Sequence, residues 1–328
     1  MLHSKTKKDA WILMVIVLVT SLRDAALKNK ERRMDFDGDC FTDADYLNLM
    51  GVSKDSFDDI CKHVKDIRHT AVRSIRTCLG IFLTKLRSGM SNKMLSTLFN
   101  VGPDAIKRAI TSGRKALMTD FVPKNIGFNH VTREEIISNH TRHLAQTLFG
   151  GPLLPAILVI DGTYIYIQKS SKFQFPRRSY NMHKHRPLVK PMIFVSTTGY
   201  IVSVLGPYLR HSKNNDAEIL KHALKTDEEA IRSWLQEDDI FIVDRDFRDS
   251  IDFLEAMEIK SEMPSFLKKN QKQHTVEESN TSRLVPKLRW VVESVNGRLK
   301  TWRFLNNIVP NSQIPYIRDY VQSILFVQ

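Results

Sequence analysis

Three carboxylates stand at positions in the chain where they could do chemistry together. Asp161 lies inside residues 155–168, PAILVIDGTYIYIQ, an apolar and β-branched run that is typical of a buried strand. An ionised carboxylate buried in such a strand costs several kcal/mol unless a cation pairs with it. The run contains no Lys or Arg, so a metal ion is the natural partner of Asp161.

The other two carboxylates follow a second strand and lie in a helix. Asp244 directly follows the short apolar run 240–243, and ligand-binding groups concentrate where strands of an α/β sheet end. Glu293 lies in residues 286–300, which we predict to be a helix that begins at Pro286. Its apolar residues have the spacing of a helix face that packs on a sheet: Leu288, Val292, Val295 and Leu299. Glu293 lies beside this stripe and can therefore face the edge of the sheet.

Three carboxylates brought together from such positions would form an oxygen-rich site that suits Mg²⁺ or Mn²⁺ and not zinc. Two such ions roughly 3.5–4 Å apart can activate an attacking oxygen and stabilise the leaving oxygen of a phosphoryl transfer. This is the chemistry of cutting and joining nucleic acid. The alternative is that each acid only forms an ion pair with a nearby Lys or Arg.

Three sequence segments around these acids resemble a known family. VIDGTYI, VDRDF and RWVVESVNGRLK, in this order, are similar to the three catalytic blocks of DDE-type transposases and endonucleases of the PIF/Harbinger kind, which contain the transposase-4 DDE domain. The chain also resembles related bacterial insertion-sequence transposases. The resemblance covers about residues 161–308 and extends more weakly into the helical region upstream.

The resemblance implies an RNase H-like α/β fold, a mixed sheet with flanking helices, preceded by an all-α helix-turn-helix domain. It implies that Asp161, Asp244 and Glu293 are the catalytic acids and hold two Mg²⁺ or Mn²⁺ ions. Relatives usually have Gly where this chain has Asp246, so Asp246 is an alternative ligand. We favour Asp244 because it directly follows the strand. Relatives also have an acid in the position of Asp216, which is a secondary candidate that a role at a helix start explains equally well.

A region of three short predicted helices, residues 72–118, lies upstream. The first ends at Gly89, Ser91 caps the second, and Pro103 opens the third after a tight turn. This order is the helix-turn-helix pattern, in which the last helix enters a DNA groove. The third helix carries basic residues that we predict to contact DNA: Lys107, Arg108, Arg114 and Lys115. A plain three-helix bundle with a solvated basic face is the alternative.

A strongly basic segment follows the Asp161 strand. Residues 169–190 contain seven Lys or Arg, no acid and three interleaved aromatic residues, which suits a stretch that tracks a phosphate backbone. We predict nucleic-acid contacts from this segment and from the end of the Glu293 helix: Arg177, Arg178, Lys184, Arg186, Lys190, Arg298 and Lys300. A solvated basic loop is the alternative.

Further elements are predicted between these motifs. Residues 190–205 have the pattern of a β-hairpin. Residues 132–148 and 226–235 predict helices, the second with Thr226 and Glu229 as a capping box.

The composition indicates an intracellular protein with a polyanionic partner. The chain has 328 residues, room for one large and one small domain, and a formal net charge of +13. A merely basic soluble protein is the alternative on charge alone. The three scattered cysteines, Cys40, Cys61 and Cys78, support neither a disulfide framework nor a Cys-based zinc site. We therefore expect a nuclear protein that works on DNA.

The N-terminal residues 10–22, AWILMVIVLVTSL, are apolar and follow three lysines, as in a signal peptide. These thirteen uncharged residues are fewer than the ~20 that span a bilayer, and no clean cleavage site follows. We expect a helix that packs on the body of the protein, or a foreign leader. No membrane partner is expected.

The predicted organisation is an apolar leader and charged linker (1–44), a helical DNA-binding region (45–124), a linker (125–154) and a DDE nuclease domain (155–328). The pattern stops within a helix, so we expect this last domain to be truncated. The predicted function is a metal-dependent DNA endonuclease or transposase, and the alternative is a domesticated transposase that binds DNA without cutting it. Expected partners are the terminal repeats and target site of the element, a second copy of the chain and an accessory DNA-binding protein.

Overall fold

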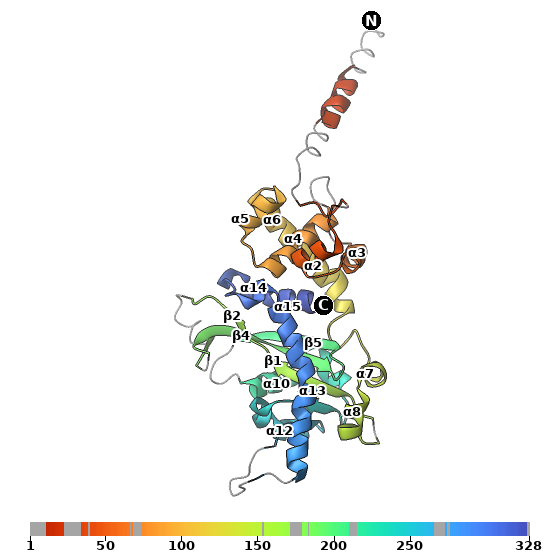
Figure 1. Cartoon of the computed structure of the whole chain (residues 1–328), viewed down its shortest axis with the longest axis vertical. Coiled ribbons are helices and arrows are strands. Elements are labelled where there is room, and N and C mark those ends of the chain that lie inside the picture. The colour runs from red at the N-terminus through yellow and green to blue at the C-terminus, as the bar shows by residue number, and fades with distance from the viewer. Residues whose placement is uncertain are drawn as a thin grey trace.

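The computed structural model of the chain describes residues 11–22, 34–38, 40–65, 67, 74–152, 154–170, 179–182, 184–209, 215–265, 273 and 276–326. A mixed β-sheet with helices on its faces forms one part of the molecule, and a helical region lies beyond one end of it (Figure 1). The predicted α/β class, with a mixed sheet and flanking helices, is confirmed.

The sheet is built around β1 (Ile157–Gly162), whose first four residues are fully buried. β4 (Arg186–Ser196) runs antiparallel along one edge of β1, and β6 (Ile240–Ile242) runs parallel along the other edge. β5 (Ile201–Leu209) pairs antiparallel with β4, as the predicted hairpin requires, and β7 (Lys260–Glu262) pairs parallel with β6. The short strands β2 (Ile165–Tyr166) and β3 (Tyr180–Asn181) also pair with β4.

The side chains of β1 alternate between the two faces of the sheet, and each face has its own hydrophobic core. Leu158 and Ile160 pack in a cluster with apolar residues of α10 (Asp216–Lys225). Ile157 and Val159 belong to the cluster that contains the apolar stripe of α13 (Val276–Lys300). Because side chains two residues apart on a strand share a face, Asp161 points to the face covered by α13. Figure 1 shows α13 crossing the sheet there.

The helix α13 is longer than predicted, because it begins at Val276 and contains Pro286 in its interior. The predicted helix start at Pro286 is wrong. A proline inside a helix removes one backbone hydrogen bond. The part of the helix after Pro286 is held by its buried residues on the sheet, which outweighs this loss.

The predicted helix 132–148 is divided into α7 (Arg133–His140), α8 (His143–Ala145) and η3 (Gln146–Gly150). At the break, the backbone N–H of Arg142 donates to Thr197 Oγ1 at 2.7 Å instead of to a helix carbonyl. Arg133, the first residue of α7, forms a double hydrogen bond with the buried Asp239. Tertiary contacts with the sheet therefore override the local helix preference.

The predicted helix 226–235 is also interrupted, by η4 (Glu228–Ala230), and only α11 (Ile231–Trp234) is a regular helix. The predicted capping box is wrong. Glu229 has a positive φ of 53° and its carboxylate accepts a hydrogen bond from Ser203 and pairs with Arg318 instead. Contacts with β5 and with a helix far along the chain hold this turn in its unusual conformation.

The described part of the helical region includes α2 (Asp43–Met50), α3 (Lys54–His63), α4 (Ile75–Ser88), α5 (Asn92–Phe99) and α6 (Pro103–Ala116). The helix end at Gly89 and the N-cap Ser91 lie where the sequence places them. Gly113 of α6 lies against α4, where a Cβ would come within 3.1 Å of the Cys78 carbonyl oxygen and of Phe82 Cβ. The absent side chain therefore lets these two helices cross closely.

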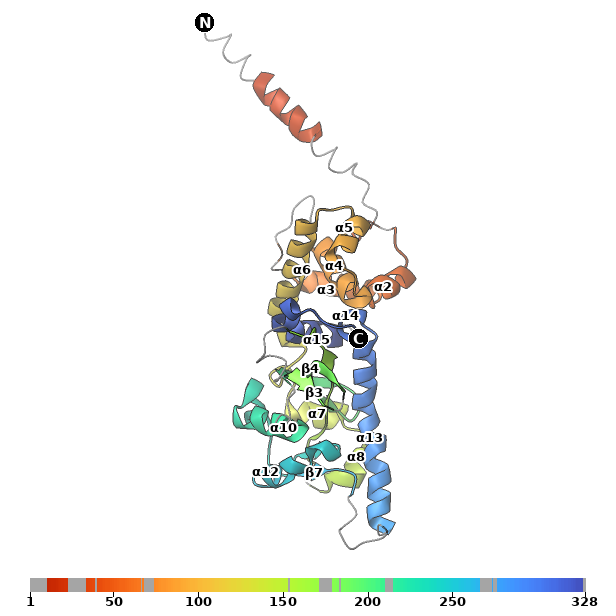
Figure 2. The same ribbon diagram turned by 90° about the vertical axis from the view of Figure 1, so that its left-hand side faces the viewer.

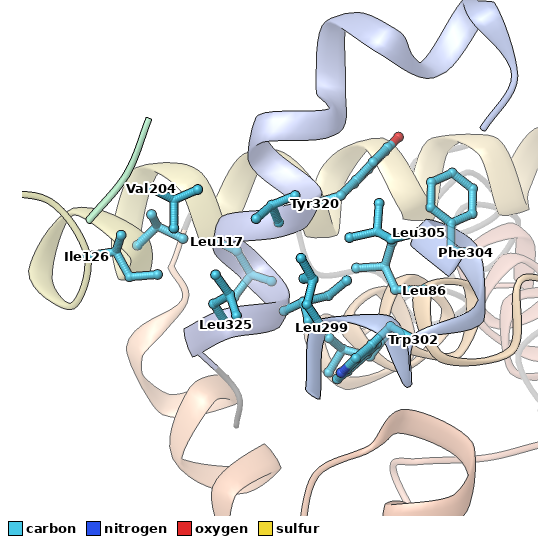
Figure 3. Close-up of a cluster of buried hydrophobic side chains, with 14 of the residues drawn as sticks. Leu86, Leu117, Ile126, Val204, Leu299, Trp302, Phe304, Leu305, Tyr320 and Leu325 are labelled. Atoms are coloured by element: carbon cyan, nitrogen blue, oxygen red, sulfur yellow. The ribbon is translucent and has the colours of Figure 1, made fainter. Parts of the chain in front are cut away.

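The helical region shares one hydrophobic core with the C-terminal end of the chain. Trp302, which follows α13, is fully buried. Figure 3 shows Trp302, Leu299 and Tyr320 packed together with Leu86 of α4. The remaining described elements are η1 (Leu117–Phe121), η2 (Val122–Lys124), η5 (Arg245–Ser250), α12 (Ile251–Glu255), α14 (Arg303–Asn306), η6 (Asn311–Tyr316) and α15 (Ile317–Phe326). Figure 2 shows α13 running along one side of the molecule to the helical region.

Residues 11–22 form a helix that does not pack on the rest of the described chain (Figures 1 and 2). Its apolar side chains are exposed, as in Trp11 at 71% and Met14 at 72%. The expectation that this helix packs on the body of the protein is therefore wrong. Among the described residues, none of the helices has the length and apolar character needed to cross a membrane.

Candidate active site

The sheet topology brings Asp161 and Asp244 to the same edge. Val159 of β1 pairs with Ile242 of β6 in parallel, and each acid lies two residues beyond this pair. Both carboxylates therefore project from the carboxyl ends of neighbouring parallel strands, where α/β proteins place their ligands. Asp244 also caps η5, because its Oδ1 accepts a hydrogen bond from the backbone N–H of Asp246 at 2.8 Å.

A single guanidinium group, that of Arg289 on α13, reaches all three predicted acids. Its Nη2 lies 3.5 Å from Asp161 Oδ1 and 3.5 Å from Asp244 Oδ2, and its Nη1 lies 3.9 Å from Glu293 Oε1. The two aspartate oxygens are thus at most about 7 Å apart, within the span of a site for two ions roughly 3.5–4 Å apart. Acids that are far apart in the sequence therefore converge on one point.

The helix α13 contributes a third polar residue, Asn296, to this point. Asn296 Nδ2 donates a hydrogen bond to Asp161 Oδ2 at 2.7 Å. Arg289, Glu293 and Asn296 follow one another at spacings of four and three residues, so they share one face of the helix. Two buried polar atoms of this group, Arg289 Nε and Asn296 Oδ1, have no hydrogen-bond partner among the described residues.

Burial dominates the electrostatics of the two aspartates. It raises the pKa of Asp161 to about 6; the nearby Arg289 opposes this rise, and Asp244 adds to it. Burial likewise raises the pKa of Asp244, again against the effect of Arg289. The side chain of Glu293 is 60% exposed. Two acids whose charge is costly in the absence of a further cation are typical of a functional site.

Comparison with protein families matches residues 160–327 to the family described as DDE superfamily endonuclease. The chain belongs to this family. The matched segment begins one residue before Asp161 and contains all three acids.

Comparison with solved structures gives distant similarities to transposase complexes. The piggyBac transposase synaptic complex with hairpin DNA has a TM-score of 0.42 and 12% identity, over 88% of this chain and 72% of that chain. A pre-cleavage Mos1 transpososome has a TM-score of 0.18 and 12% identity, over 80% of this chain and 82% of that chain. The Mos1 mariner paired end complex with Mn has a TM-score of 0.19 and 13% identity, over 83% of this chain and 87% of that chain. No curated protein matches the chain.

Two other acids considered in the sequence lie differently in this DDE family member. Asp246 is exposed on η5, and its contribution to the site is the backbone N–H that binds Asp244. Asp216 is buried at the start of α10 and pairs with Lys190. A Cβ on Gly162 would come within 2.9 Å of Asp216 Oδ1, so this ion pair packs directly behind the strand that carries Asp161.

The predicted DNA-contacting residues are divided between surface and interior. Lys107, Arg108 and Lys115 are exposed on α6. Arg114 is 12% exposed, pairs with Asp319 of α15 and lies 4.0 Å from the ring centre of Tyr316. Its charge is therefore used in the contact between α6 and α15.

Among the basic residues of segment 169–190 and of the end of α13, Lys190 is buried against Asp216 and is not presented to solvent. Lys184, Arg186 and Arg298 are exposed, and Lys300 is half-buried at the end of α13. Arg177 and Arg178 lie outside the described residues.

The donor set fits a hard divalent cation once Arg289 turns away. Carboxylate oxygens from three elements face one point, and carboxylate oxygens are the ligands that such an ion prefers. Among the described residues, no group of three or more His, Cys, Asp or Glu side chains forms a metal centre as the side chains stand. Because the Arg289 guanidinium lies between the acids, we infer that a cation would have to displace it.

Sequence reasoning missed Arg289 and Asn296. The signal that could have found them is their spacing from Glu293, one helical turn before it and one turn after it. Any polar residue at those positions shares the helix face that Glu293 turns toward the sheet.

Proposed function

We propose that the chain is a metal-dependent DNA endonuclease or transposase in which Asp161, Asp244 and Glu293 hold two Mg²⁺ or Mn²⁺ ions. The observation that carries this proposal is the convergence of the three acids on one guanidinium group. The family membership supports it. The strand order β5–β4–β1–β6–β7, with the last two strands parallel to β1, supports an RNase H-like assignment of the sheet.

Divalent ions, when bound there, would activate the attacking oxygen and stabilise the oxygen that leaves the phosphodiester. The fold of the chain holds the three acids in place. Asp161 and Asp244 extend from adjacent buried strands, so their relative position is fixed by the sheet. Glu293 approaches from α13 and is open to solvent, which suits the side that faces DNA. Asn296 orients Asp161 through its hydrogen bond.

The helix α6 is proposed as the recognition helix of a helix-turn-helix, with Lys107, Arg108 and Lys115 toward DNA. The exposed Arg298 lies beyond Glu293 on α13 and suits a phosphate contact. We propose that the protein works in the nucleus on the ends and target site of a mobile element, as a homodimer and with an accessory DNA-binding protein. Salt dependence of DNA affinity would measure the phosphate contacts.

The test is nicking of a supercoiled plasmid and of terminal-repeat DNA with Mg²⁺ or Mn²⁺. We expect the unmodified protein to nick DNA and Asp161→Asn and Glu293→Gln to lose this activity. Asp249→Asn is the matched control, because Asp249 is an exposed acid on η5. Full activity of Asp161→Asn would rule out the assignment of the acids.

A catalytically silent DNA-binding protein is the second candidate, and the position of Arg289 among the acids favours it. It predicts DNA binding that persists when all three acids are replaced, and no cleavage with either metal. The same nicking and binding assays therefore separate the two functions.

A further inference from the structure

Two tyrosines and three basic residues form a cluster beside the three acids, which we call the Tyr164 cluster: Tyr164, Tyr166, Lys184, Arg186 and Lys300. Lys300 Nζ lies 4.2 Å and Lys184 Nζ 5.0 Å from the ring centre of Tyr164. The guanidinium of Arg186 lies 5.4 Å from the ring centre of Tyr166, and the two tyrosine rings are 5.4 Å apart. Cations and partly exposed rings are therefore interleaved on one surface.

The cluster is close to the proposed cleavage site along two elements. Tyr164 lies three residues beyond Asp161, about 10 Å along an extended chain. Lys300 lies seven residues beyond Glu293 on α13, again about 10 Å along a helix. At a rise of 3.4 Å per nucleotide, this distance corresponds to about three nucleotides of a strand.

A purely structural role does not account for the cluster. The ammonium groups of Lys184 and Lys300 meet at one ring and are at most about 9 Å apart, close to one screening length, so they repel each other. Among the described residues, neither forms an ion pair with a carboxylate, and residues 169–190 contain no acid. Burial alone would raise the pKa of the Tyr164 hydroxyl, but the nearby Lys300 and Lys184 lower it overall. Positive charge without a balancing group indicates an anionic ligand.

We propose that the Tyr164 cluster binds an unpaired segment of the DNA strand about three nucleotides from the phosphate that is cut. Lys184 and Lys300 hold a backbone phosphate with the Tyr164 hydroxyl between them, and Tyr166 with Arg186 receives the face of an unstacked base. Base faces are accessible only where a strand is unpaired, which is why rings interleaved with cations favour a single strand over a duplex. This inference rests on the proposed function.

The test measures DNA affinity in EDTA, where no cutting occurs, by fluorescence anisotropy of a labelled single-stranded oligonucleotide and of a duplex of equal length. Lys184→Ala and Lys300→Ala should each lower the slope of log affinity against log salt for the single strand by about 0.7. Tyr166→Leu should weaken single-strand binding about fivefold or more and leave duplex binding nearly unchanged. Tyr166→Phe, which keeps the ring, should bind like the unmodified protein.

Lys225→Ala is the matched control, because Lys225 makes a similar contact with Phe253, 5.2 Å from its ring centre, on α10. It should leave single-strand binding unchanged. Thermal melting of each variant checks that it is folded. Single-strand affinity that is the same in all variants, or an equal loss for duplex and single strand, would overturn the inference. If the unmodified protein nicks plasmid with Mn²⁺ but the variants give one of these two results, only the role of the Tyr164 cluster is refuted. If the unmodified protein neither binds nor nicks DNA, the proposed function is refuted as well.

Discussion

Removal of the buried charge at Asp161 should stabilise the protein in the absence of metal. Burial raises the pKa of Asp161 from 3.8 to about 6, and 15% of its side chain is exposed. Because of this difference in pKa, ionised Asp161 lowers the free energy of unfolding by about 3 kcal/mol. An acid with a raised folded pKa binds its proton more tightly in the folded state. The penalty is therefore absent below about pH 4 and complete above about pH 6.

We expect Asp161→Asn to unfold at a higher urea concentration than the unmodified protein at pH 8 in EDTA. Its free energy of unfolding should be higher by up to about 3 kcal/mol, which corresponds to roughly 5 °C in Tm. Below pH 4 the difference should disappear. Addition of Mn²⁺ should stabilise the unmodified protein and not the variant.

Asp239→Asn is the control, because Asp239 is fully buried but is bound by Arg133 and by the backbone N–H of Ala156 at 2.8 Å. Breaking such a buried pair should destabilise the protein by about 3–5 kcal/mol. If Asp161→Asn loses as much stability as Asp239→Asn at pH 8, or shifts stability equally at all pH values, the reasoning about Asp161 is refuted.

Three further predictions concern the site and the helical region. Asp244→Asn should lower the nicking rate with Mn²⁺ by more than about 10–100-fold, whereas the exposed Asp246→Asn should keep most of it; equal losses would contradict the choice of Asp244. Arg289→Gln should raise the pKa of Asp161 further, because Arg289 opposes its rise; an unchanged pKa in an NMR titration of the carboxyl carbon in EDTA would show that this contact is unimportant. Gly113→Val should cost about 1–3 kcal/mol in urea unfolding because its Cβ would meet Phe82 Cβ at 3.1 Å; unchanged stability would show that α4 and α6 can separate.

The parts of the site that depend on local pattern could be predicted from the sequence. The apolar run around Asp161 is a strand because both of its faces are buried, by α10 on one side and α13 on the other. Asp244 follows a strand, as its position after an apolar run indicated. These signals lie within a few residues of the acids themselves.

The parts that depend on distant partners could not be predicted. Arg and Lys are residue types that usually lie on the surface, but Arg114 and Lys190 are each paired with an acid on another element. Arg114 pairs with Asp319, and Lys190 pairs with Asp216. The start of α13 was misplaced because the proline rule describes an isolated helix and not one held on a sheet. Arg289 was overlooked because its role depends on which face of α13 meets the sheet, and this is set by tertiary packing.

The most direct test of the account is the location of Mn²⁺ by anomalous diffraction from crystals of the protein grown with Mn²⁺ and a DNA end. The account predicts Mn²⁺ bound by the carboxylates of Asp161, Asp244 and Glu293, with the Arg289 guanidinium moved out from between them. Arg289 still in contact with all three carboxylates, and no Mn²⁺ beside them at saturating concentration, would contradict it.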